Sequence, residues 1–123
     1  LKELTYTIAE PYSSADFLHG PVAMMQRAFP VMMIAPQGKV YATMLELLQA
    51  LRREHQAELV VISNQDEALK LANSPIRIPM DVPEWLSPLV AIIPGQLFAY
   101  QLTCARGYNP EAPRTIHKVT ETH

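Results

Sequence analysis

The chain has 123 residues, of which 49% are hydrophobic and 18% charged, the balance of one modest globular domain. Its formal net charge is −2 and its Lys and Arg residues form no cluster, which argues against a surface for duplex nucleic acid. The single cysteine, Cys104, excludes an intrachain disulfide and fits a reducing compartment, so we expect a cytoplasmic protein.

The first segment, "LKEL", is typical of the last turn of a helix that begins before Leu1. We therefore expect this chain to be part of a longer protein. "YSSADF" then places Ser13 and Ser14 before a short helix. Hydroxyl groups at that position are typical helix caps, and capping is the favoured interpretation. Contact with a phosphate group is the alternative.

The next segment, "DFLHGP", interrupts an apolar run with His19 and a Gly-Pro turn. Glycine permits unusual dihedral angles and proline fixes the following turn, so the histidine is held at a defined position at the edge of a loop or helix. An imidazole there can exchange protons near neutral pH. A hydrogen-bonded structural histidine is the alternative.

The middle of the chain alternates buried strands and helices. Continuous apolar runs predict strands that are buried on both faces, and helical spacing or an acidic first turn predicts the helices. In chain order these are a strand at 29–36, a helix within 38–56, a strand at 57–64, a short helix at 65–72 and a strand at 74–80 with Ile76 and Ile78 on one side.

The most apolar region, 85–105, predicts a long buried helix, kinked or restarted at Pro94 because proline removes a backbone donor. Its proline, glycine and glutamine residues argue against a membrane span. The helix should end near Gly107 with a left-handed cap. The tail, 108–123, is polar, rich in proline and expected to be irregular.

This strand–helix alternation predicts an α/β fold with a right-handed parallel sheet. Three strands are few for a sheet that must be covered on both faces. We therefore expect the domain to be incomplete here, with further strands in a longer chain or in a partner.

Two further residues could take part in acid–base or carbonyl chemistry. Glu3 could serve as a base if its carboxylate is partly desolvated, although most such glutamates are surface charges. Lys118, four residues after Arg114, could polarise a carbonyl or form a Schiff base, although tail lysines are mostly inert. The remaining histidines show no metal-ligand spacing with Cys104, and no glycine-rich nucleotide motif occurs, so we expect neither a metal nor a nucleotide site.

Three segments together resemble one family: "LKEL…AEPYSSADFLHGP", "IIPGQLFAYQLTCARG" and "PEAPRTIHKVTE". They are similar to the sugar isomerase (SIS) domain family, in particular the second SIS domain of glucosamine-6-phosphate synthases and of stand-alone double-SIS phosphosugar isomerases and deaminases. The resemblance implies a three-layer α-β-α sandwich with a flavodoxin-like parallel sheet. A partial SIS domain would occupy 1–107, and the tail 108–123 would carry an active-site lysine.

The resemblance also implies roles for individual residues. Glu3 falls on the base that moves a proton between C1 and C2 of the open-chain sugar. His19 falls on the histidine that assists ring opening in a neighbouring subunit's active site, and Lys118 on the lysine near the sugar's carbonyl carbon. Ser13, Ser14 and Arg114 are predicted to contact the substrate. The reaction requires no metal or organic cofactor.

The predicted function is an aldose–ketose isomerase, aminotransferase or deaminase that acts on fructose 6-phosphate or glucosamine 6-phosphate through an enediol. Its expected partners are the sugar phosphate, a preceding SIS domain and a homodimer partner, with neither nucleic acid nor membrane. The family's serine- and threonine-rich phosphate loop is absent from this chain, and Glu111 replaces the family's aspartate. One alternative is a non-catalytic sugar-phosphate sensor; another is a structural half that is inert by itself.

Overall fold

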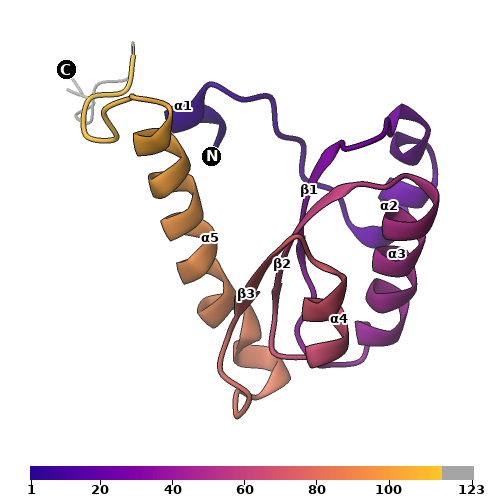
Figure 1. Cartoon of the computed structure of the whole chain (residues 1–123). Helices are drawn as coiled ribbons and strands as arrows, with labels where there is room; N and C mark the ends of the chain where they lie inside the picture. The colour runs from indigo at the N-terminus through magenta and orange to yellow at the C-terminus, as the bar shows by residue number, and fades with distance from the viewer. Residues whose placement is uncertain (115–123) are drawn as a thin grey trace, which may run out of the picture. The chain divides into compact units, whose positions relative to one another are not determined.

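The computed structural model describes residues 1–114 (Figure 1). The chain divides into two compact units. One unit is Pro11–Pro94, and the other joins Leu1–Glu10 to the segment that begins at Gly95.

The unit Pro11–Pro94 is built on a parallel sheet of three strands in the order β1-β2-β3. The strands are β1 (Pro30–Ile34), β2 (Glu58–Ser63) and β3 (Ser74–Arg77). Met33 pairs with Val61, and Ile62 pairs with Ile76. Successive strands are therefore neighbours joined by helical crossovers, as the alternation of strands and helices predicts.

One face of the sheet is covered by α3 (Tyr41–Glu54) and α4 (Asp66–Leu71), as Figure 1 shows. The apolar stripe of α3 points inward because its leucines recur at three- and four-residue spacing. Its buried residues pack on alternate side chains of β2. The members of this core are Met33, Ala35, Leu47, Leu48, Leu51, Ala57, Leu59, Val61 and Ala68.

The other face of the sheet is covered in part by the start of α5 (Ser87–Ala105). Ile62, Ile78 and Ala91 form a second buried cluster there, with Ile76 and Val90 packed against it. Helices therefore lie on both faces of the strands, which confirms the layered α-β-α architecture.

The prediction that the first strand is buried on both faces is wrong for the described chain. Met32 and Ile34 are 36% and 42% exposed, and both lie on the face of the sheet that α5 covers. An apolar cavity of about 400 Å³ opens there, lined by Ile34, Pro36, Ser87, Pro88, Ala91 and Ile92. The start of α5 packs on β2 and the residue after β3, so it leaves β1 uncovered on this side.

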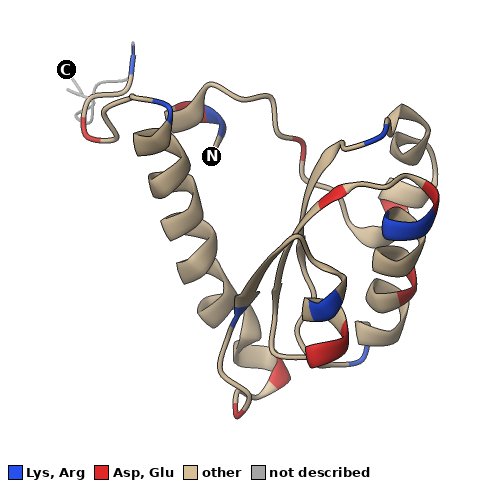
Figure 2. Ribbon diagram, in the orientation of Figure 1, with Lys and Arg blue, Asp and Glu red and all other residues tan. Residues whose placement is uncertain are grey.

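The long helix predicted at 85–105 is present as α5, but the prediction that it is buried is wrong for the described chain. Helix α5 runs without a break through Pro94, and it exposes Leu89, Ile92, Ile93, Leu97 and Tyr100. Figure 2 shows that it carries no charged residue along its length. By length and composition alone Glu84–Ala105 could cross a membrane, but a single helix of this kind is weak evidence of a span. Of the kink or restart predicted at Pro94, the restart does not occur, because one continuous helix contains this proline.

The end of α5 matches its prediction. Gly107 has a φ of 73°, its N–H donates to the Cys104 carbonyl over 2.9 Å, and the Tyr108 N–H donates to the Thr103 carbonyl over 3.1 Å. These two bonds form a Schellman motif, which satisfies the last carbonyls of the helix and reverses the chain. Residues 108–114 then form turns without regular structure.

Arg77 holds the pKa of Asp66 below its usual value, through a hydrogen bond first and its charge second. We expect Arg77→Gln to raise the pKa of Asp66 toward 3.8. Because the folded pKa is depressed, the pair's contribution to stability is present above the unfolded pKa and is lost as the pH falls through the folded one. A carboxyl-carbon NMR titration measures this change. Arg52→Gln is the control, and an unchanged Asp66 pKa in Arg77→Gln would contradict the assignment.

Candidate functional site

Glu3 lies in α1 (Lys2–Thr5), a single helical turn, and its side chain is exposed. The helix ends at Tyr6, whose φ of 53° places a bulky residue in the left-handed region. That conformation costs roughly 1–2 kcal/mol for a residue with a side chain, so the surrounding contacts must hold it. The expected helical turn at "LKEL" is confirmed. The partial desolvation that would favour a basic Glu3 is not seen in the described chain.

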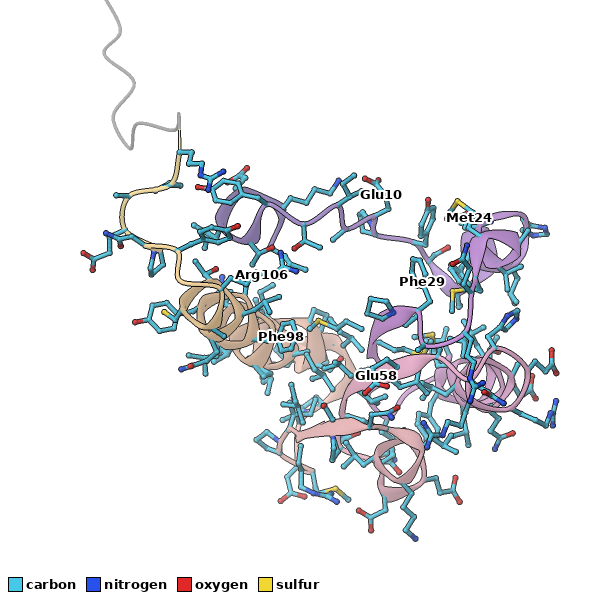
Figure 3. All side chains as sticks on the ribbon, turned by 45° about the horizontal axis from the view of Figure 1, so that its top comes forward. Glu10, Met24, Phe29, Glu58, Phe98 and Arg106 are labelled. Carbon is cyan, nitrogen blue, oxygen red and sulfur yellow. The ribbon has the colours of Figure 1, made fainter. Side chains whose placement is uncertain are left out.

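Arg106, just after α5, ties the end of that helix to the segment that follows α1 (Figure 3). Its Nη1 donates to the Thr5 carbonyl over 3.0 Å and to Thr7 Oγ1 over 2.6 Å. Thr5 is fully buried, and its Oγ1 donates to the Leu1 carbonyl over 3.0 Å. The two charge-assisted bonds of Arg106 join two parts of the chain that are about a hundred residues apart.

Arg114 makes the second link between the same two segments. Its backbone N–H donates to the Tyr6 hydroxyl over 2.7 Å. Its guanidinium carbon lies 4.6 Å from the centroid of the Tyr6 ring and 5.2 Å from that of Tyr108. The two rings meet edge to face with centroids 4.9 Å apart. We call Tyr6, Tyr108 and Arg114 the tyrosine–arginine clasp.

His19 is the C-terminal cap of α2 (Ser14–Leu18) and is exposed. Its backbone N–H donates to the Asp16 carbonyl over 3.3 Å, and Pro21 then begins the 3₁₀ turn η1 (Pro21–Met24). Gly20 has a φ of 174° and a ψ of −54°, a combination that is neither helical nor extended. The turn still presents the imidazole to solvent at a fixed position, as the sequence predicts.

Ser13 is the N-cap of α2, as the favoured interpretation predicts. Its Oγ accepts from the Asp16 N–H over 3.1 Å and donates to Asp16 Oδ2 over 2.6 Å. Ser14 is half-buried in the first turn of the same helix. Contact of either hydroxyl with the substrate stays a prediction.

The predicted residues are distributed over both units. Glu3 and Arg114 lie in the unit that joins Leu1–Glu10 to the segment beginning at Gly95, where Arg114 contacts Tyr6, three residues after Glu3. His19, with Ser13 and Ser14, lies in the sheet-containing unit. Lys118 lies outside the described residues. The convergence of Glu3, His19 and Lys118 around one sugar therefore stays a prediction.

A polar cluster at the carboxyl ends of β1 and β2 has no counterpart among the predicted site residues. Asn64 Oδ1 accepts from the Gln37 N–H over 2.8 Å and from Gln65 Nε2 over 3.3 Å, while Ser63 Oγ donates to the Ala35 carbonyl over 2.6 Å. Ligands of open α/β sheets bind at this edge. The bonds within the cluster satisfy its own polar groups, which indicates a structural role. Among residues 1–114, no three His, Cys, Asp or Glu side chains gather as metal ligands.

Comparison with known proteins gives a consistent result. A family model described as the SIS domain matches residues 1–106. The chain is 35% identical over 118 residues to a glutamine–fructose-6-phosphate aminotransferase (isomerizing) of Thermococcus kodakarensis, and 35% identical over 120 residues to the protein of the same name of Gloeobacter violaceus. Each alignment covers 96% of this chain and 19% of the relative, so the chain spans about a fifth of their length.

A solved structure shares the fold. It is the C-terminal domain of glucosamine-fructose-6-phosphate aminotransferase from Francisella tularensis, with a TM-score of 0.71 and 27% sequence identity. The match covers 88% of this chain and 30% of the other.

Proposed function

The chain belongs to the SIS domain family, and from that premise we propose that it is the C-terminal SIS half of a phosphosugar isomerase, aminotransferase or deaminase. Fructose 6-phosphate and glucosamine 6-phosphate are the proposed substrates. The observation that carries the proposal is the 35% identity to enzymes named isomerizing aminotransferases, over 96% of the chain. Glu3, His19 and Lys118 are the residues assigned to the chemistry.

The proposed reaction passes through an enediol. His19 moves a hydroxyl proton while the sugar ring opens, and Glu3 removes the proton from C1 of the ketose. A double bond then forms between C1 and C2, and the developing oxyanion is stabilised by the Lys118 ammonium. After its carboxyl proton exchanges with solvent, Glu3 delivers a proton to C2 while the O1 hydroxyl proton passes to the C2 oxygen, which completes the aldose. General acid–base steps of this kind typically contribute about 10²–10⁴-fold in rate.

The whole enzyme would contain more than this chain. We propose a preceding SIS domain, which supplies the phosphate-binding loop that this chain lacks, and a homodimer partner whose active site receives His19. The apolar cavity beside β1 and the exposed Met32 and Ile34 support a partner on that face. The 123 residues by themselves are expected to be inactive.

The test uses the full-length protein with fructose 6-phosphate and ammonia, and separately with glucosamine 6-phosphate, in deuterated water. We expect sugar-phosphate interconversion with one solvent deuterium incorporated at carbon, because an enediol exchanges its carbon-bound proton. Mass spectrometry and NMR measure both. Binding of the sugar phosphate without turnover or exchange would instead support the sensor alternative, and absence of both would contradict the substrate class.

A further inference from the structure

Glu3 lies inside a helical turn that backbone hydrogen bonds close. The Thr5 N–H donates to the Leu1 carbonyl over 3.0 Å, and Thr5 Oγ1 donates to the same carbonyl over 3.0 Å. The Tyr6 N–H donates to the Lys2 carbonyl over 2.9 Å. These bonds span Glu3, so the direction of its backbone depends on how firmly they are held. Thr5 and Tyr6 are therefore the residues through which the turn can be fixed.

Arg106 holds this turn at its end (Figure 3). Its Nη1 carries two hydrogens, and it donates to the Thr5 carbonyl over 3.0 Å and to Thr7 Oγ1 over 2.6 Å. Hydrogen bonds from an ionised donor are roughly twice as strong as those between neutral groups. The Thr5 carbonyl belongs to the last residue of α1, where helical carbonyls lack intrahelical donors and the helix dipole favours a cation. The guanidinium therefore stabilises the turn at the point where the helix ends.

The position of Arg106 is itself fixed by the end of α5. Its backbone N–H donates to the Leu102 carbonyl over 3.1 Å, and the Schellman motif at Gly107 follows directly. Tyr108, the next residue, packs edge to face on the Tyr6 ring. The capped end of α5 therefore contacts the end of α1 through two side chains that flank one glycine.

The backbone of Tyr6 shows what these contacts must hold. Its φ of 53° lies in the left-handed region, which is rare for tyrosine and persists where surrounding contacts determine it. The residues on either side, Thr5 and Thr7, are the two that accept from Arg106. Loss of these bonds allows Tyr6 to relax to a commoner conformation, which lets the turn that carries Glu3 unwind.

We propose that Arg106 is a positioning residue for Glu3, because it fixes the end of α1 and so holds the carboxylate where it takes the carbon-bound proton. This inference rests on the proposed function, in which Glu3 is the base. A misplacement of about 1 Å can lower a catalysed rate about 10²-fold. A residue that positions a base affects turnover, whereas one that binds the substrate equally in ground and transition states affects KM.

The kinetic test uses Arg106→Met in the full-length enzyme with fructose 6-phosphate and ammonia. Loss of the guanidinium is expected to lower kcat about tenfold and to change KM less than about threefold. Thr7→Val removes one of the two acceptors and keeps the shape of the side chain, so it should lower kcat about threefold. Where Arg106→Met fails to fold, Thr7→Val decides the test by itself.

The matched control for this test is Arg53→Met. Arg53 is likewise an exposed arginine, in the last turn of α3, and it donates to the neighbouring Glu54 over 2.8 Å. Its replacement should leave kcat and KM within about twofold of wild type. A rise in KM at constant kcat in Arg106→Met would overturn the proposal in favour of direct substrate binding. Wild-type kinetics in Arg106→Met would also overturn it.

A double-mutant cycle shows whether Arg106 acts through Glu3. In a Glu3→Gln enzyme, adding Arg106→Met should lower kcat less than about twofold further, because the base that it positions is gone. Full additivity of the two losses would overturn the proposal. A Glu3→Gln enzyme with wild-type kcat would overturn both the base assignment and the positioning role.

Hydrogen exchange separates failure of the anchor from failure of the proposed function. Mass spectrometry measures deuterium uptake in the full-length protein, in the peptide that contains Thr5 and Tyr6. Arg106→Met should make these two amides exchange about tenfold faster than in wild type and in Arg53→Met. Equal exchange rates would overturn the proposal. Faster exchange in a protein that turns over no sugar phosphate would uphold the anchor and reject the proposed function, and with it the role of Arg106 in turnover.

Discussion

Replacing Glu3 with glutamine should lower sugar-phosphate turnover of the full-length enzyme by about 10²–10⁴-fold. Glutamine has nearly the same size and shape but cannot accept the carbon-bound proton. The Glu3 side chain is exposed on a single helical turn, so the substitution removes a base without disturbing a core. Steady-state kinetics with fructose 6-phosphate and ammonia measures the loss, and deuterium incorporation at carbon should fall in parallel.

The control for this prediction is Glu46→Gln. Glu46 is also an exposed helical glutamate, and it lies on α3 in the sheet-containing unit. The same chemical change there should leave turnover within about twofold, because surface substitutions of this kind have small effects. Wild-type turnover in Glu3→Gln would reject Glu3 as the base, even if the enzyme proves to be an isomerase.

Replacing Leu48 with alanine should destabilise the sheet-containing unit by about 2–5 kcal/mol. The Leu48 side chain is 0% exposed on α3 and belongs to the core that packs on β2. Removing three carbons there forfeits burial and leaves a cavity that the close-packed core cannot fill. Hydrogen exchange of α3 and β2 peptides in the full-length protein should then become about 30-fold faster or more, since 1.4 kcal/mol corresponds to tenfold.

Val40→Ala is the matched control for Leu48→Ala. Val40 precedes α3 and is 63% exposed, so its truncation should change exchange by an amount within about 0.5 kcal/mol. Exchange in Leu48→Ala no faster than in this control would show that the α3 leucines do not form the core of the unit.

Local patterns in the sequence predict most of the fold correctly. The leucine spacing of α3, the Ser13 cap and the Gly107 cap depend on contacts within a few residues, and all three are confirmed. The errors concern Met32 on β1 and the exposed face of α5. An apolar run indicates that a segment is buried in the folded protein, but it does not show which element covers it. The sequence therefore predicts burial for faces of β1 and α5 that no residue of the described chain covers.

The candidate site was harder to predict for a related reason. Glu3 was assigned by resemblance, and nothing in "LKEL" by itself distinguishes it from a surface charge. Tyr6 and Tyr108 were missed because the clasp joins residues about a hundred positions apart, which no local periodicity reveals. The left-handed backbone of Tyr6 is likewise set by tertiary contacts, since tyrosine has no intrinsic preference for it.

The uncovered side of β1 has a practical consequence for handling these residues in the laboratory. Met32, Ile34 and the neighbouring cavity form an exposed apolar patch on the edge strand β1. Surfaces of this kind bind chaperones and promote aggregation with other partly folded chains. A plasmid that encodes only these 123 residues should yield mostly inclusion bodies. Co-producing the preceding SIS domain that we propose should bring the fragment into the soluble fraction of the lysate.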